Sequence, residues 1–211
     1  MAVIIRDEFT GMSSGDDIGG RTPSPTNTPG NTWNENAANT IESDGSGAIT
    51  AAASADDAWI DTGEIDCAVS IEFNAGGADN RCSVYARTNN QHVASGTFDG
   101  YETNWRIGAD TVHINKVVDG GSTQLGATIS QTLTDTTTYK FELEVNGTTI
   151  RALLDDGEIG SRVDSAIDGT TEGGSYGNFT HWLRTDGAAR FDNFEVDDLA
   201  AAGGTAVIIG P

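Results

Sequence analysis

Basic residues are scarce in this sequence. The chain has 11 Lys and Arg residues against 32 Asp and Glu residues, so its formal net charge is −21. Nucleic-acid backbones and anionic membrane surfaces are both bound through concentrations of Lys and Arg. We therefore expect neither nucleic acid nor a membrane among the partners of this protein.

Cysteine is equally scarce, and histidine is dispersed. The 2 cysteines, Cys67 and Cys82, lie in no C-x-x-C motif, and His92, His113 and His181 stand singly along the chain. Metal centres and nucleophilic sites need tighter groupings of these residues. We expect the histidines to be ordinary surface or strand residues. The cysteines are expected to be two buried thiols, with a disulfide between neighbouring strands as the alternative.

Long apolar runs and helical periodicity are missing. Residues 1–6 contain neither a basic leader nor an apolar stretch of signal-peptide length, and no later stretch has the length of a membrane span. We therefore expect synthesis in the cytoplasm without a secretion signal. No sustained 3.6-residue pattern is present, so we expect no helix longer than about three turns.

Short alternating segments fill the sequence instead. Its 27 glycines, with Asn, Asp, Ser and Thr, separate segments in which β-branched and aromatic residues alternate with polar ones. This is the pattern of half-buried strands joined by tight turns. The expected strands are 58–61, 65–73, 83–88, 93–98, 101–107, 112–118, 139–145, 148–154, 179–184 and 190–196.

Turn residues indicate how several of these strands pair. Asn146-Gly147 joins 139–145 to 148–154, and Asp99-Gly100 joins 93–98 to 101–107; both dipeptides favour type I′ hairpins. So many antiparallel strands exceed what one open sheet usually carries. The sequence therefore predicts an all-β fold, a two-sheet antiparallel jelly-roll sandwich.

The sandwich is expected to form one domain over residues 1–199. Within it, residues 11–39 contain Pro, Gly and Ser and are interpreted as a loop across one face, anchored by Trp33. Residues 200–211 begin with an Ala- and Gly-rich spacer and are interpreted as a flexible C-terminal tail.

Segments near the two ends carry a resemblance to a known family. The RFDNFEV sequence at 190–196 and the RDEF sequence at 6–9 resemble the closing strands of concanavalin A-like lectin/glucanase domains of the LamG-like kind. Trp33 and the hairpin 139–154 fall where that pattern places them, and the resemblance covers about residues 5–198. It implies a concanavalin A-like jelly roll. Such domains occur in bacteriophage virion proteins, secreted glycan-binding modules and glycosidases, so the resemblance leaves function open.

Family 16 glucanases belong to the same superfamily, and Glu64 and Asp66 invite comparison with their catalytic strand. Retaining hydrolysis needs two carboxyl groups about 5 Å apart. In the family pattern the second carboxylate would fall at a position that Ala68 or Val69 occupies here. We therefore expect no catalytic residue, and Glu64 is interpreted as a turn residue.

Two kinds of binding site are candidates. Aromatic rings stack on sugar rings, and the candidates for such a glycan platform are Tyr101, Trp105, Tyr176 and Trp182. Pairing of the first and last strands would gather carboxylates that can bind a structural Ca²⁺, and these candidates are Asp7, Glu8 and Asp192. Ordinary acidic residues on edge strands are the alternative to the cation site. No other cofactor is expected.

Apolar segments near both ends carry the main functional hypothesis. These segments are Val3-Ile4-Ile5 and Val207-Ile208-Ile209. Exposed β-prone segments can add a strand to a neighbouring protein. With no catalytic set, we interpret the chain as a structural or interaction protein on the surface of a phage virion, such as a capsid decoration, head-fibre or tail-associated protein.

The virion hypothesis names the partners. They would be a viral capsid or tail protein and further copies of the chain in a homo-oligomer such as a trimer. The alternative is a lectin-type carbohydrate-binding module that binds a surface glycan. A glycoside hydrolase-like enzyme is the third hypothesis.

Overall fold

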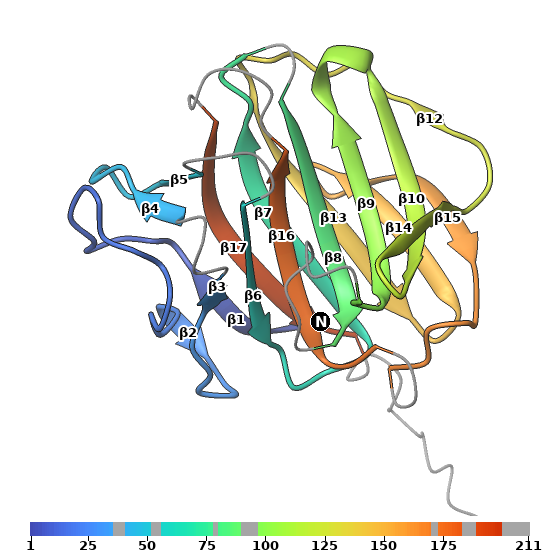
Figure 1. Cartoon of the computed structure of the whole chain (residues 1–211), viewed down its shortest axis with the longest axis horizontal. Helices are drawn as coiled ribbons and strands as arrows, with labels where there is room; N and C mark the ends of the chain where they lie inside the picture. Colours follow the sequence, from blue (N-terminus) through green and yellow to red (C-terminus); the bar gives the residue numbers. More distant parts are fainter. Residues whose placement is uncertain are drawn as a thin grey trace, which may run out of the picture.

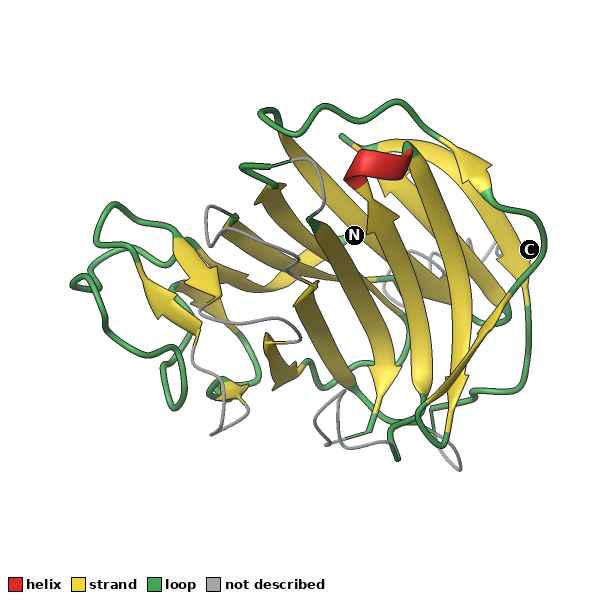
Figure 2. Ribbon diagram, turned by 45° about the horizontal axis from the view of Figure 1, so that its top comes forward, coloured by secondary structure: helices red, strands yellow, loops and turns green. Residues whose placement is uncertain are grey.

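The computed structural model describes residues 1–35, 41–51, 56–77, 80–89, 97–169, 173–182 and 189–199. Two antiparallel sheets lie face to face (Figure 1). Within these residues the helical element is the 3₁₀ turn η2 (Ile107–Ala109), which joins two strands of the front sheet (Figure 2). No helix in this part of the chain is long and apolar enough to span a membrane. The predicted all-β two-sheet sandwich is confirmed.

Sheet A has 9 strands. Its main path runs in the order β15 (Gly157–Val163), β14 (Thr149–Leu154), β13 (Thr138–Asn146), β7 (Cys67–Asn74), β17 (Arg190–Asp198), β1 (Ala2–Asp7) and β2 (Pro25–Asn27). Off this path, β5 (Ile49–Ala51) pairs with β17 and with β4 (Ile41–Ser43).

Sheet B has 8 strands and lies in front of sheet A in Figure 1. Its order is β11 (Gly121–Gln124), β10 (Thr111–Val118), β9 (Gly100–Arg106), β8 (Arg81–Thr88), β16 (Tyr176–Trp182), β6 (Asp56–Asp61) and β3 (Asn34–Glu35). A further short strand, β12 (Ile129–Ser130), pairs with β10. The segment 11–39, interpreted as a loop, thus contributes β2 to one sheet and β3 to the other.

The first and last strands pair as the resemblance implies. β1 and β17 are antiparallel, with Arg6 opposite Glu195 and Asp7 opposite Phe194. Trp33 is 1% exposed and meets Phe194 edge-on with ring centroids 4.7 Å apart. The predicted anchoring of this segment by Trp33 is confirmed.

The core lies between the two sheets. Apolar residues at alternate positions of the longer strands point inward and form one contiguous cluster. Trp105 of β9 stacks on Phe141 of β13 with ring centroids 4.2 Å apart, which joins the two sheets. Cys67 and Cys82 are buried and free, as expected. Burial raises the pKa of the Cys67 thiol to about 12 and that of Cys82 well above its usual value.

Two hairpins depart from the prediction. Asn146 still pairs with Thr149 across the β13–β14 hairpin, so the two-residue link is Gly147-Thr148, one residue later than expected. The predicted hairpin at Asp99-Gly100 is wrong, because β8 and β10 occupy both edges of β9. Residues 90–96, which include most of the predicted strand 93–98, lie outside the described residues.

Candidate functional site

The N-terminal apolar segment is already part of a sheet. β1 pairs with β17 on one edge and with β2 on the other. Ile5 is fully buried, Ile4 packs against the core, and Val3 is 40% exposed. This arrangement contradicts the expectation that Val3, Ile4 and Ile5 form a free segment for strand addition. The other segment, Val207, Ile208 and Ile209, lies outside the described residues.

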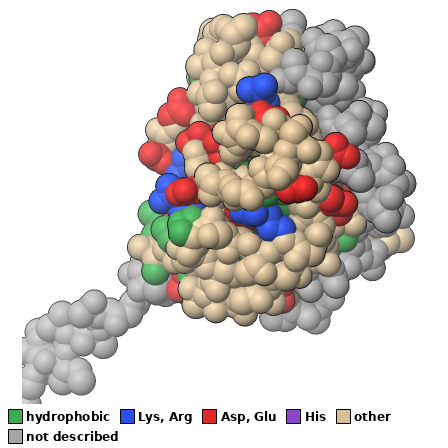
Figure 3. Space-filling view, turned by 90° about the vertical axis from the view of Figure 1, so that its left-hand side faces the viewer, with side chains coloured by type: hydrophobic (Ala, Val, Ile, Leu, Met, Phe, Trp, Pro, Cys, Tyr) green, Lys and Arg blue, Asp and Glu red, His purple; other side chains and the backbone are tan. Residues whose placement is uncertain are grey.

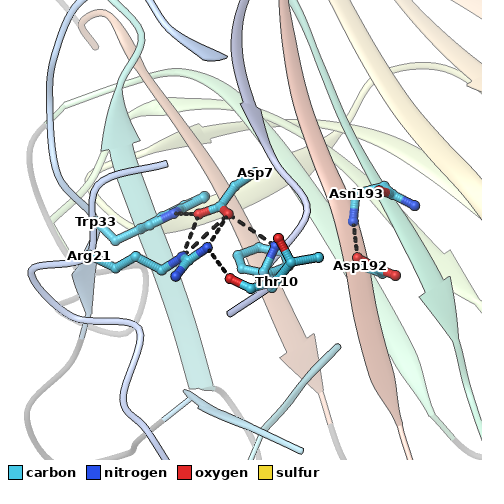
Figure 4. A network of polar contacts seen from close by, with 7 residues as sticks. Asp7, Thr10, Arg21, Trp33, Asp192 and Asn193 are labelled. Carbon is cyan, nitrogen blue, oxygen red and sulfur yellow. Dashed lines mark hydrogen bonds and ion pairs between the residues drawn. The ribbon is translucent and has the colours of Figure 1, made fainter. Parts of the chain in front are cut away.

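Two of the carboxylates expected to share a cation, Asp7 and Asp192, are held by different partners on neighbouring strands. Asp7 is fully buried and accepts hydrogen bonds from Arg21 Nη2 at 3.0 Å, Trp33 Nε1 at 2.9 Å and the Phe9 amide at 3.0 Å (Figure 4). Asp192 lies apart, on the neighbouring strand, and accepts from the Asn193 amide at 2.7 Å.

The described residues contain no group of three or more His, Cys, Asp or Glu side chains that could hold a metal ion. Asp7, Glu8 and Asp192 therefore do not form the expected Ca²⁺ site. Asp7 instead has a structural role, because it fixes the Arg21 guanidinium and the Trp33 indole on the loop that follows β1.

Two of the four aromatic candidates belong to the core. Tyr101 and Trp105 are fully buried. The Tyr101 hydroxyl donates to Asp164 Oδ1 at 2.9 Å, and Trp105 stacks on Phe141. The prediction that these two rings form a glycan platform is wrong. The side chains of Tyr176 and Trp182 lie outside the described part of the chain.

The two carboxylates compared with a glucanase strand precede that strand. β7 begins at Cys67, so Glu64 and Asp66 lie in the turn before it. Asp66 forms an ion pair with Arg87 and accepts a hydrogen bond from the Gly147 amide at 3.0 Å. The interpretation of Glu64 as a turn residue is confirmed.

A polar cluster lies on the outer face of sheet B. Side chains alternate between the two faces of a strand, and Val84, Trp105 and Ile114 face the core. Their neighbours on the same strands face outward. The Glu102 cluster, as we name it, consists of Ser83 and Tyr85 on β8, Glu102 and Asn104 on β9, and Asn115 on β10. All of these side chains are buried, and Glu102 is 5% exposed.

Neutral donors surround the Glu102 carboxylate. Its Oε1 accepts from Ser83 Oγ at 2.7 Å, Tyr85 Oη at 3.1 Å and Asn104 Nδ2 at 3.1 Å. Its Oε2 accepts from Asn115 Nδ2 at 2.7 Å and only distantly from Ser122 Oγ at 3.5 Å. Each carboxylate oxygen has about two lone-pair sites. Oε1 is therefore saturated, whereas Oε2 retains capacity for a further donor.

An apolar edge borders this cluster. Tyr85 and Phe98 meet edge-to-face with ring centroids 5.5 Å apart, and Val117 completes a small apolar group separate from the main core. Tyr85 belongs to both groups, because its ring packs on Phe98 while its hydroxyl donates to Glu102. The outer face of sheet B thus combines hydrogen-bonding and apolar surfaces side by side.

Cationic side chains lie at the other end of the cluster. Arg81 and Arg106 occupy directly opposite positions on β8 and β9. Arg106 Nε donates to Asn104 Oδ1 at 2.9 Å, which links the guanidinium to the Glu102 cluster. Burial lowers the pKa of the nearby His113, and the positive charges of Arg106 and Arg81 lower it further, while the charge of Glu102 opposes them.

The outer side of sheet A carries an acidic cavity. Its volume is about 510 Å³, and its lining includes Glu72, Asn74, Thr138 and Asp192. Burial raises the pKa of Asp192, and the negative charges of Glu72, Glu8 and Asp44 raise it further. Arg190 also lines this cavity and pairs with Asp44 at 3.5 Å. Acidic and basic side chains are interspersed on this end of the molecule (Figure 3).

The sequence contains a pattern that indicates the Glu102 cluster, but a choice of candidates by their aromatic rings does not find it. In β9, Glu102, Asn104 and Arg106 alternate with the core residues Tyr101, Thr103 and Trp105. The aromatic residues of this strand are the ones that face the core. The polar residues between them face outward, and the structure places them beside the outward polar residues of β8 and β10.

The sequence matches no protein-family model and no curated protein sequence. Solved structures share the fold. The carbohydrate-binding module CBM66 from Bacillus subtilis is 15% identical with a TM-score of 0.54, and the match covers 89% of this chain and 98% of that one. A Bacillus subtilis protein of unknown function with a galectin-like fold is 12% identical with a TM-score of 0.59, over 93% and 96%.

A third structure comes from the endo-acting O-glycanases that prominent members of the human gut microbiota express to initiate mucin breakdown. It is 8% identical with a TM-score of 0.61, over 94% of this chain and 100% of that one. These likenesses show a galectin-like and concanavalin A-like jelly roll. Binding modules and enzymes both have this fold, and no comparison supports the virion hypothesis.

Proposed function

We propose that this domain binds carbohydrate through the outer face of sheet B, at the Glu102 cluster. The observation that carries the proposal is the state of Glu102. Its carboxylate is buried and oriented by neutral donors, yet Oε2 keeps the capacity to accept another hydrogen bond. A buried carboxylate is normally paired with a cation, so this arrangement favours a ligand donor over an internal partner.

Sugar hydroxyl groups both donate and accept, so a sugar site needs both kinds of protein group. Glu102 Oε2 supplies an acceptor, and Asn115 Oδ1 has no partner within the described residues and supplies a second. Arg106 supplies donors at the other end of the cluster. The Tyr85–Phe98 pair is 2% and 3% exposed, so it packs beside the cluster and orients the Tyr85 hydroxyl that donates to Glu102.

Binding without hydrolysis is the form of this function that the residues favour. A glycosidase of the usual kind needs a second carboxyl group within about 5 to 9.5 Å of the first. The cross-strand neighbours of Glu102 are Tyr85 and Asn115, and the next outward residue on its strand is Asn104. Among the described outward residues of β8, β9 and β10, Glu102 is the only carboxylate.

The test is a charge-removing substitution with a matched control. Glu102→Gln keeps the shape of the side chain but removes the acceptor charge, and it should weaken glycan binding by about tenfold to a hundredfold. Glu144→Gln is the control, because Glu144 is similarly buried but lies on sheet A, 3.2 Å from Arg151 Nη1. Ligands are found on a glycan array and measured by calorimetry.

Near-ultraviolet circular dichroism establishes that each variant is folded before its affinity is compared. Unchanged affinity in a folded Glu102→Gln variant would move the binding site elsewhere. Release of reducing ends from the bound glycan, lost in Glu102→Gln, would show that the domain is an enzyme.

A further inference from the structure

Arg106 differs from most basic residues of this chain. Arg21, Lys116 and Arg151 each lie 3.0 to 3.2 Å from a carboxylate oxygen. Arg106 is partly exposed, its described hydrogen bond is the one to Asn104, and no carboxylate pairs with it within the described residues. With 32 acidic residues available for 11 basic ones, a guanidinium that lacks a carboxylate partner calls for an explanation.

Arg162 shows what a structural explanation would look like. It also has no carboxylate partner in the described part of the chain, but its guanidinium donates to the backbone carbonyls of Leu125 and Ala127. These bonds connect the segment after β11 to β15. Arg106 makes no such set of carbonyl contacts, and its one described partner belongs to the Glu102 cluster.

A second positive charge lies opposite Arg106. Arg81 stands directly opposite on β8, and like charges at opposite positions of an antiparallel pair destabilise a sheet. The nearby His113 is affected by both positive charges, since they lower its pKa. An anionic ligand group beside Arg106 would be attracted by the positive charges of both guanidinium groups.

Asn104 connects this cationic end to the proposed sugar site. Its Oδ1 accepts from Arg106 Nε, and its Nδ2 donates to Ser83 Oγ at 2.8 Å and to Glu102 Oε1 at 3.1 Å. The amide is therefore fixed from both sides, and it holds the guanidinium in one orientation. A guanidinium oriented in this way can bind a carboxylate or sulfate through two parallel hydrogen bonds.

We propose that the ligand is an acidic glycan whose carboxylate or sulfate ester binds Arg106, beside Arg81 and His113, while its uncharged hydroxyls reach Glu102 and Asn115. This proposal rests on the proposed function of the same face. A chain with a net charge of −21 repels anions at long range, but at physiological ionic strength such repulsion is screened beyond about 8 Å. Local contacts with Arg106 therefore decide the specificity.

The experiment uses an array on which every acidic glycan is printed beside its neutral counterpart. Uronate oligosaccharides are paired with their carboxyl-reduced forms, sialylated glycans with desialylated forms, and sulfated glycans with desulfated forms. The wild-type protein should bind one or more acidic members at least about tenfold more tightly than their counterparts, as expected for a charge-assisted bidentate contact. Whether the carboxylate or the sulfate pairs respond identifies the anionic group.

Arg106→Gln, Arg106→Lys and the control Arg151→Gln are then compared by calorimetry. Arg106→Gln should lose the preference for the acidic member, so that the acidic and neutral members of a pair bind with similar affinity. Arg106→Lys should keep part of the preference, because a lysine retains the charge but not the two-pronged geometry. Arg151→Gln should behave as the wild type, since Arg151 pairs with Glu144 on the other sheet.

The outcomes separate this inference from the proposed function. Equal or tighter binding of neutral members, lost in Glu102→Gln, would overturn the acidic ligand and retain the sugar site. A preference for acidic members that survives Arg106→Gln would also overturn the role of Arg106. Absence of binding to every glycan pair would overturn the proposed function and this inference with it.

Discussion

β13 on the outer face of sheet A and β9 on the outer face of sheet B differ in how their charged side chains are paired. On sheet A, Glu142 and Glu144 lie 3.2 Å from Lys140 Nζ and Arg151 Nη1, so each carboxylate has a cation beside it. On sheet B, Glu102 is bound by neutral donors and Arg106 by a neutral acceptor. The paired charges of β13 need no ligand to balance them. A face whose opposite charges are kept apart on the same strand can bind a ligand at both.

The ion pairs of sheet A also shift the pKa values of the residues that form them. Burial alone would lower the pKa of Lys140, but the hydrogen bond to Asp156 and the charge of Glu142 raise it above its usual value. Burial raises the pKa of Glu142, and the charge of Lys140 counteracts this effect. These opposing influences are what a self-contained ion pair produces.

Asp7 provides the reference for a charge whose role is purely structural. It is fully buried and pairs with Arg21, which is 17% exposed. Asp7→Ala should lower the free energy of unfolding by about 3 to 5 kcal/mol, because it leaves the guanidinium and the Trp33 indole without their acceptor. Urea denaturation measures this loss, and a loss below 1 kcal/mol, on the order of a surface ion pair, would contradict the structural role. We expect no change of glycan affinity in any fraction that remains folded.

Truncation of one carboxylate on each outer face should change the free energy of unfolding by different amounts, in addition to the difference in glycan binding. Glu102→Ala leaves the donors of Ser83, Tyr85 and Asn115 without their acceptor, and should cost about 2 to 3 kcal/mol of unfolding free energy. Glu144→Ala removes a pair whose arginine is 47% exposed and should cost about 1 kcal/mol or less. Equal costs in parallel urea denaturations would remove the distinction between the faces.

Much of the fold could be predicted because its strands alternate clearly. β7, β9 and β13 have apolar or β-branched residues at every second position, and the prediction locates these strands together with β10 and β17. β11 and β15 were missed, because GSTQ and GEIGSRV contain few apolar residues. Each follows a tight turn whose residues adopt positive φ, Asp119-Gly120 and Asp155-Asp156 respectively. The first dipeptide is a familiar hairpin signal, whereas the second is rarer in hairpins.

The site was harder to predict than the fold because an alternating strand has two faces of similar appearance. In β9 the sequence contains aromatic residues suited to stacking on sugars, Tyr101 and Trp105, and polar residues suited to hydrogen bonding, Glu102 and Asn104. Which set faces outward depends on the packing of Trp105 against Phe141, a contact between residues far apart in the sequence. A displacement of one residue exchanges the two faces, so periodicity alone does not settle the choice.

The acidic cavity on sheet A allows the effect on stability of a charge without a cationic partner among the described residues to be measured. The pKa of Asp192 is raised in the folded state, which means that the folded state binds this proton more tightly than the unfolded state does. Ionisation of Asp192 therefore destabilises the fold. Asp192→Asn should raise the melting temperature by a few degrees at neutral pH, because the amide oxygen can still accept from the Asn193 amide.

The pH dependence of this stabilisation follows from the sign of the shift. The advantage of Asp192→Asn should shrink as the pH falls through the raised pKa, and it should vanish below the ordinary value of 3.8. Differential scanning fluorimetry from neutral to acidic pH measures it. A variant that is less stable than the wild type at neutral pH would show that Asp192 has a stabilising partner in this cavity.

The smallest expected effect is a shift in the titration of His113, which reports directly on the charge of the ligand. In the free protein, burial and the positive charges of Arg106 on β9 and Arg81 on β8 hold the pKa of His113 below its ordinary value of 6.5, against the opposing charge of Glu102. The folded state therefore disfavours the protonated imidazole. The stability that the neutral imidazole contributes is present above pH 6.5 and is lost as the pH falls toward the lowered pKa.

A bound carboxylate or sulfate beside Arg106 would offset the positive charges and raise the pKa of His113. By linkage, affinity for an acidic glycan should then increase as the pH falls through this range. Proton NMR titration of the His113 ring, assigned by the loss of its signal in His113→Gln, measures the pKa with and without saturating ligand, and the neutral counterpart serves as the control. An acidic glycan that leaves this pKa unchanged, or a neutral one that raises it equally, would place the anionic group away from Arg106 and would make the separated charges of sheet B a property of the fold alone.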